Sequence, residues 1–150
     1  MPAREAAASP PLDQFLTYRL HQVNKITDKA SSDAYAQELG LPVGEARCLA
    51  AIGHFAPLSV AQLAARANLD KAQASRAAQA LVERGWVRKE ARADDARAVV
   101  LRLSAEGRRW WNRVMRLIAR RNEEIFGCLS RREQVQLAAM LERVVEQARG

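Results

Sequence analysis

Apolar residues recur at helical spacing along most of the chain, which predicts a mainly α-helical protein. The first amphipathic helix is expected to begin at Leu12 and to run to about Lys29. A short helical turn is expected to follow it and to end at Gly40. A second helix is expected from residue 43 until Pro57 interrupts it, because proline cannot continue a helix.

Two short helices are then predicted back to back by their starting sequences. Ser59 is followed three residues later by Gln62, and Asp70 is followed three residues later by Gln73. Each pair has the pattern of a capping box, in which two side chains satisfy the free N–H groups at a helix start. Gly85 stands where the second helix needs a left-handed residue to end.

The next segment has the pattern of a β-hairpin. WVRKE at 86–90 and AVVLRLS at 98–104 are β-prone, and the polar sequence ARADDAR at 91–97 joins them. Ser104 is then expected to cap a long helix. The sequence SRRE at 130–133 is a third capping box and is expected to open a final helix.

This order of elements predicts a winged helix-turn-helix, a mainly α fold with a small β-hairpin wing. In that fold the second helix can enter the major groove of DNA, and the hairpin can lie along the backbone. The terminal helices carry more apolar surface than the small middle domain can cover, so we expect them to join two copies into a homodimer. A two-fold dimer matches a palindromic operator. The expected regions are a flexible tail at 1–11, an N-terminal dimerisation helix region at 12–42, the winged DNA-binding domain at 43–103 and C-terminal helices that complete the dimerisation domain at 104–150.

The composition gives the chain a net positive charge. Lys and Arg number 24 against 17 Asp and Glu, so the formal net charge is +7, and such a field attracts polyanions such as double-stranded DNA. Cys48 and Cys128 lie far apart, and the only histidines are His21 and His54, so neither a metal site nor a disulfide framework is expected, and no cofactor is implied. The N-terminus lacks the apolar stretch of a signal peptide, and no run reaches about 18 apolar residues. A cytoplasmic protein without a membrane span is therefore expected.

The wing sequence carries the most specific resemblance to a known family. Asp95-x-Arg97 precedes alternating apolar residues and then Ser104. With FLTYRL, LSVAQLAARANLDKAQASRAAQALVERGWVRKE and DDARAVVLRLSAEG, this pattern resembles the MarR family of bacterial transcription regulators over nearly the whole chain. The wing departs from the family at Ala93, where Pro is frequent, and at Ala96, where a second Arg is common. The resemblance implies a dimeric regulator, typically a repressor.

The second helix of the pair is expected to expose one face and to bury the opposite one, a stripe formed by Ala74, Ala77, Ala78 and Leu81. On the exposed face, Gln73, Arg76 and Gln79 are expected to read bases directly. Arg can make two hydrogen bonds to guanine, and Gln can make two to adenine. The alternative is a solvated helix face without base contacts. The other candidates for DNA contact on this helix are Lys71, Ala72 and Ser75.

The wing and one helix start provide further candidates for DNA contact. Arg97 is expected to reach the minor groove or its phosphates, and Asp95 is expected to pair with Arg97 and fix its direction. Arg92 in the wing and Ser59 at a helix start are candidates for phosphate contact. The alternative is a wing whose charges serve its own structure.

The resemblance also implies a small-molecule effector, often an aromatic carboxylate or a phenol, that binds between the dimer helices and the winged domain and releases DNA. Arg19 can pair with a carboxylate, and the phenol and imidazole groups can bond ring substituents. For each residue the alternative is packing or an exposed polar group. The candidates for ligand contact are Tyr18, Arg19, His21, His54 and Trp111.

Two other interpretations remain open at this stage. The chain could be a winged-helix module that binds protein or RNA without a ligand response. An enzyme is the least favoured class, because no nucleophile–base pair, glycine-rich phosphate loop or paired carboxylate array is present in the sequence. Nothing near Cys48 indicates a lowered thiol pKa, so we expect Cys48 and Cys128 to be buried, unreactive thiols.

Overall fold

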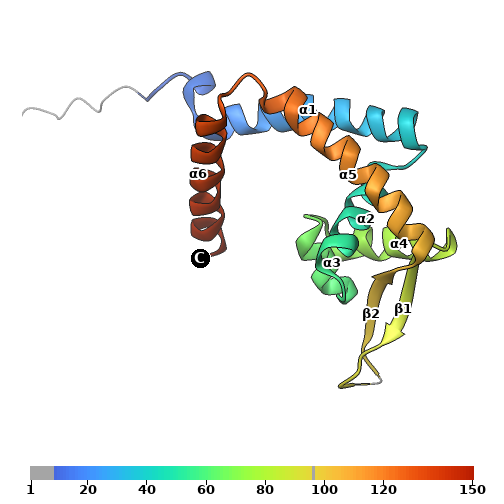
Figure 1. Ribbon diagram of the computed structural model, residues 1–150. Helices are drawn as coiled ribbons and strands as arrows, with labels where there is room; N and C mark the ends of the chain where they lie inside the picture. Colours follow the sequence, from blue (N-terminus) through green and yellow to red (C-terminus); the bar gives the residue numbers. More distant parts are fainter. Residues whose placement is uncertain (1–8, 96) are drawn as a thin grey trace, which may run out of the picture.

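The computed structural model describes residues 9–95 and 97–150 and has helices along most of its length with one β-hairpin (Figure 1). The predicted fold class is confirmed. The expected tail falls mostly outside the described residues, and residues 9–11 form neither helix nor strand. The elements are η1 (Leu12–Gln14), α1 (Leu16–Leu39), α2 (Val43–Phe55), α3 (Val60–Arg66), α4 (Lys71–Glu83), β1 (Val87–Ala91), β2 (Val99–Leu103), α5 (Ala105–Phe126) and α6 (Arg131–Arg149).

Helices α3 and α4 form the helix-turn-helix, and both of their predicted capping boxes are present. The Ser59 hydroxyl accepts a hydrogen bond from the Gln62 N–H at 3.1 Å, and the Gln62 side chain accepts one from the Ser59 N–H at 2.8 Å. Asp70 and Gln73 make the same reciprocal pair at 2.7 and 3.2 Å. Between the helices, Asn68 adopts a left-handed conformation with φ 56°, which a short polar side chain tolerates. Local sequence therefore determines the turn.

The hairpin is attached to the helix-turn-helix at both ends. Gly85, with φ 77°, ends α4 and directs the chain into β1. The strands pair antiparallel, with Val87 opposite Leu103 at the base. The Leu101 N–H donates to the carbonyl of Leu58 at 2.8 Å, and this isolated bridge ties β2 to the chain two residues before α3. The wing thus starts from a fixed position beside α3.

The hydrophobic core lies inside the winged unit. It is formed by α2, α3, α4 and the base of the hairpin, and the N-terminal half of α5 closes it through Val114. The larger side chains of this core interdigitate between the small residues of α4, which let the helices approach closely. Its fully buried side chains include Leu49, Ile52, Leu63, Leu81 and Leu101.

The end of α4 is joined to the start of α5 by a stack of aromatic and cationic groups. The rings of Trp86 and Trp110 stack with their centroids 4.4 Å apart and an interplanar angle of 21°. Arg84 lies over the Trp86 ring, and Arg113 lies over the Trp110 ring. The Arg84 guanidinium also pairs with Glu45 of α2 at 2.8 Å, so three helices meet at this stack.

The N-terminal helix differs from the prediction. It begins at Leu16, after the separate turn η1. The prediction that it ends near Lys29 is wrong, because the helix continues without a break to Leu39. The Ser-Ser-Asp sequence has low helix propensity, but tertiary contacts outweigh it. Tyr35 is buried against the core, and the Arg121 side chain of α5 donates to the Ser31 hydroxyl at 3.2 Å.

The beginning of α1 and all of α6 lie away from the core (Figure 1). Helix α6 has no buried residue, although one of its faces is apolar. Among the residues that the structure describes, no helix combines the length and the apolar character needed to cross a lipid bilayer.

Candidate nucleic-acid interface

Helix α4 has one buried and one exposed face, as predicted. Ala74, Ala77, Ala78 and Leu81 are all buried, with exposed fractions from 0% to 7%. The small residues allow α4 to pack closely against α2 and α3. Every candidate for DNA contact on α4 is exposed, namely Lys71, Ala72, Gln73, Ser75, Arg76 and Gln79.

The three side chains predicted to read bases differ in how many of their hydrogen-bonding groups already have partners within the protein. The Gln73 side-chain oxygen accepts the Asp70 N–H in the capping box, so only its NH₂ group remains for another partner. The Gln79 oxygen accepts a hydrogen bond from Lys89 of β1 at 3.0 Å, and its NH₂ group lies 3.4 Å from the Glu83 carboxylate. Gln79 therefore connects the wing to α4.

Arg76 differs from both glutamines. Within residues 9–95 and 97–150 it makes no hydrogen bond or ion pair, and its side chain is exposed. Arginine presents a planar fork of donors that fits the N7 and O6 acceptors of guanine in the major groove. Arg76 is therefore the best-placed side chain on α4 for base contact.

The wing carries its charges in close pairs. Arg92 donates two hydrogen bonds of 3.0 Å to the Asp94 carboxylate. Asp95 accepts from the backbone N–H of Arg97 at 3.0 Å, so its carboxylate stabilises the turn. The expected ion pair between Asp95 and the Arg97 guanidinium is not present within the described part of the wing, where the Asp95 carboxylate instead accepts the Arg97 backbone N–H. Ala96, the other noted departure from the family pattern, lies outside the described residues.

The helix-turn-helix and the wing lie at the same end of the molecule. In Figure 1 the hairpin extends away from α1, and α3 and α4 lie beside its base. Ser59, the candidate for phosphate contact, is half-buried at the start of α3, and its hydroxyl oxygen already accepts the Gln62 N–H. Its O–H remains available as a donor.

A cavity of about 800 Å³ lies between α1, α2, α5 and the turn that precedes α4. Arg47 pairs with Asp28 across it at 3.1 Å. The Arg66 guanidinium lies 4.4 Å from the centre of the Phe55 ring, and no carboxylate in the described residues pairs with it. The lining residues are Asn24, Asp28, Arg47, Ala50, Ala51, His54, Phe55, Arg66, Ala67, Asn68, Met115 and Ile118.

Of the five predicted ligand-contact residues, the structure places only His54 on this cavity. Tyr18, Arg19 and His21 are exposed on the first turns of α1 and are not among its lining residues. The Trp111 indole N–H donates to the Ala50 carbonyl at 3.1 Å, so it has a structural partner. The polar residues that do line the cavity come from separate elements, and no local motif indicated that they would converge.

The cysteines differ in environment. Cys48 is fully buried, as predicted, and burial raises the pKa of its thiol to about 11, with a further contribution from the nearby Glu45 charge. The prediction that Cys128 is buried is wrong, because it lies exposed in the turn between α5 and α6.

Known proteins share this architecture. Residues 39–98 match the family model described as MarR family. A probable transcriptional regulator from Pseudomonas aeruginosa is 25% identical, with 89% of this chain and 99% of that chain covered at a TM-score of 0.74. A MarR family transcriptional regulator from Silicibacter pomeroyi is 22% identical, with 99% of both chains covered at a TM-score of 0.82.

BpsR from Bordetella bronchiseptica also has this fold. It is 15% identical, with 92% of this chain and 98% of that chain covered at a TM-score of 0.80, and its structure concerns regulation of DNA binding by 6-hydroxynicotinic acid. No curated protein is similar enough in sequence to count as a relative. The family match covers α2, α3, α4 and β1, and the structural likeness covers nearly the whole chain, so the resemblance is confirmed and the chain has the fold of MarR-family transcriptional regulators.

Proposed function

We propose that this protein is a homodimeric transcriptional regulator that binds a specific, palindromic double-stranded DNA operator and acts as a repressor. The observation that carries the proposal is the two-sided helix α4, which buries its alanine stripe and leaves Arg76 exposed, without a partner among the residues that the structure describes. A winged helix-turn-helix with this face is suited to the major groove. Residues 43–103 would form the DNA-binding domain, with dimerisation regions at 12–42 and 104–150.

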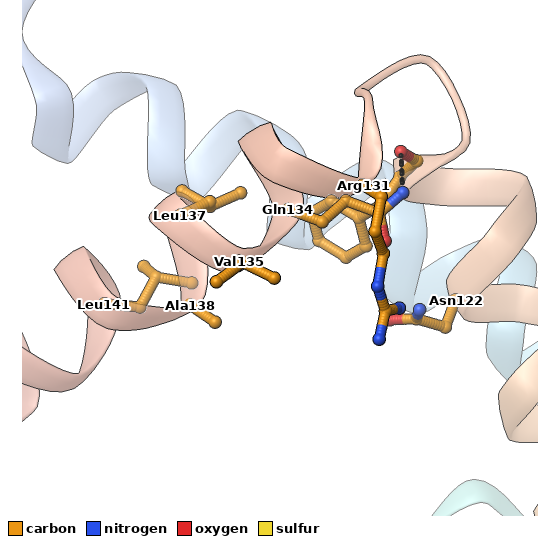
Figure 2. Close-up of a pocket in the computed structure, with 8 residues that line it drawn as sticks. Asn122, Arg131, Gln134, Val135, Leu137, Ala138 and Leu141 are labelled. Carbon is orange, nitrogen blue, oxygen red and sulfur yellow. Dashed lines mark hydrogen bonds between the residues drawn. The ribbon is translucent and has the colours of Figure 1, made fainter.

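The terminal helices support the homodimer. In proteins an amphipathic helix gains most of its stability by packing its apolar face, and α6 has no buried residue, so its apolar face needs a partner. A groove of about 350 Å³ runs between α6 and the end of α5, and Val135, Ala138 and Leu141 lie along it (Figure 2). In the proposed dimer a second copy would cover the exposed apolar residues, which are Leu12, Phe15, Leu16, Leu20, Val23 and Ile26 near the N-terminus and Val135, Met140, Leu141, Val144 and Val145 in α6.

The proposed DNA contacts divide between the two grooves. Arg76 would read base edges in the major groove, with Gln73 and the small Ala72 beside it. Arg97 at the wing tip would enter the minor groove, and Arg92 would contact phosphates. Gln79 would act mainly by holding Lys89, and with it the wing, in position.

The proposed effector is a small aromatic carboxylate or phenol bound in the cavity beside Arg66. That guanidinium can pair with a carboxylate, and the neighbouring Phe55 and His54 rings can pack on an aromatic ligand. The regulation of BpsR by an aromatic acid is in keeping with this ligand class. Because Asn68 lines the cavity two residues before Asp70, the cap of α4, a ligand there would act on the position of α4.

A gel-shift titration with DNA from upstream of the protein's own gene, with and without a panel of aromatic acids, tests the proposal. We expect specific binding whose log affinity falls by roughly 0.9 per phosphate contact for each decade of salt. At least one acid should release the DNA. Absent or salt-insensitive duplex binding would favour the alternative, a winged-helix module for protein or RNA.

Sedimentation analysis tests the dimer separately. Leu141→Asp places a charge on the apolar face of α6 and should yield monomers. Gln136→Asp, on the exposed polar face of the same helix, is the matched control and should remain dimeric. Equal behaviour of both variants would contradict the interface.

A further inference from the structure

A second groove, of about 410 Å³, lies between the wing and the start of α3. Gln62 of α3 lines one side of it. On the wing side, the charged residues Glu90, Arg92, Asp94 and Arg102 line it. The sequence indicates a DNA contact only for Arg92 of this set, so the other charges need an explanation.

The arginines of this groove are each held by a carboxylate. Arg102 pairs with Glu90 at 3.0 Å, and Arg88, which stands directly opposite Arg102 in the hairpin, lies 3.8 Å from the same carboxylate. Glu90 therefore separates two like charges that the strand register places side by side. At the tip, Arg92 is held by Asp94.

All of these pairs are exposed to solvent. Their side chains retain exposed fractions between 39% and 69%. Exposed ion pairs contribute little to stability because water screens them, so a stronger anion can replace the carboxylate at small cost. Arginine binds a phosphate group through the same two-point geometry that it uses for a carboxylate.

We propose that this groove is a seat for a phosphate of the DNA backbone, in which Arg102 and Arg92 exchange their carboxylate partners for phosphate oxygens. The inference rests on the proposed function, since it requires duplex DNA beside the wing. Glu90 then has a defined effect on binding. Its charge repels the incoming phosphate and holds Arg102, so Glu90 sets the affinity of the wing below the value that its arginines alone would give.

Fluorescence anisotropy with a labelled duplex of about 30 base pairs of mixed sequence tests this proposal, since phosphate contacts do not depend on base sequence. At about 50 mM salt, Glu90→Gln should bind the duplex about threefold to fivefold more tightly than the unchanged protein. The gain should shrink at about 200 mM salt, because screening weakens the removed repulsion. Asp94→Asn should change binding in the same direction.

The matched control is Glu123→Gln in the last turn of α5, far from the wing, which adds the same charge to the molecule (Figure 1). It should alter affinity by less than about twofold. Arg102→Gln should weaken binding and reduce the salt slope by about 0.9. The melting temperature of each variant should match that of the unchanged protein, which would show that the fold is retained.

The outcomes separate the two proposals. If the unchanged protein binds no duplex, both fail. If it binds and Glu90→Gln matches Glu123→Gln or binds more weakly, the seat is wrong and Glu90 only orients its arginines, while the regulator proposal stands. An Arg102→Gln variant with unchanged affinity and slope would likewise overturn the seat alone. Repeating the titration with inorganic phosphate in place of chloride at equal ionic strength should weaken binding of the unchanged protein more than that of Arg102→Gln.

Discussion

Gly107, in the first turn of α5, packs directly against the backbone carbonyl of Trp86. A Cβ atom at position 107 would overlap that oxygen. The carbonyl cannot move aside freely, because it also accepts the Ser104 N–H at 2.9 Å. We therefore expect Gly107→Ala to destabilise the fold by about 1–3 kcal/mol, as measured by urea unfolding.

Gly44→Ala provides the control for this prediction. Gly44 lies in α2, and a Cβ atom there would meet no other atom within 4 Å. Alanine has the higher helix propensity, so this variant should be stabilised by up to about 1 kcal/mol. Equal losses in both variants would mean that the contact between Gly107 and Trp86 has no special role.

The two roles of Gln73 can be separated by Gln73→Glu. A glutamate keeps the oxygen that accepts the Asp70 N–H, so the helix cap and the melting temperature should be retained. The variant loses the NH₂ donor and adds a negative charge, which would face DNA in the proposed complex. Operator affinity in anisotropy titrations should fall at least tenfold. A variant that loses stability and keeps its affinity would make Gln73 a capping residue only.

Replacing Arg76 and replacing Arg97 with alanine are expected to change DNA binding in different ways. Arg76→Ala should cost about 1–3 kcal/mol on the best operator and much less on random DNA, so that sequence preference is relaxed. Arg97→Ala should weaken operator and random DNA by similar factors. Competition titrations with both DNAs measure the difference, and equal, sequence-independent losses from the two variants would contradict the assignment of base reading to Arg76.

Cys48 should not react with thiol reagents while the protein is folded. Its pKa of about 11 leaves roughly one thiol in a thousand ionised at about pH 8, and the side chain is fully buried. In a Cys128→Ser variant, mass spectrometry after iodoacetamide treatment should find Cys48 unmodified until denaturant is added. Rapid labelling of the folded protein would indicate that α2 opens locally.

Local signals in the sequence were sufficient to predict the helix-turn-helix. The residue pairs Ser59–Gln62 and Asp70–Gln73 act within one helical turn, so their effect does not depend on the rest of the chain. Gly85 is a similar case, because its left-handed conformation is required by the end of α4 itself. These features can be identified from a few neighbouring residues.

The remaining differences involve contacts between distant parts of the chain. Helix α1 continues through Ser31 and is held there by tertiary contacts, namely burial of Tyr35 and a hydrogen bond from Arg121, 90 residues after Ser31. The cavity beside Arg66 is also lined by Asp28 of α1 and Arg47 of α2. The engagement of Gln79 by Lys89 depends on where the hairpin folds back. Helical spacing reports which face of an element is buried and does not report which elements meet.

Because Trp86 stacks on Trp110, a change in the tilt of α5 is transmitted along the helix to the end of α4. With 22 residues at 1.5 Å each, α5 is about 33 Å long. Its N-terminal part is packed through Trp110 against Trp86, just after the end of α4, and its other end lies near α6. A tilt of about 5° between the ends of a rod of this length displaces one of them by about 3 Å. That is close to the rise of one base pair, so in the proposed dimer a small reorientation at the α6 end of α5 would be enough to move Arg76 out of register with the DNA.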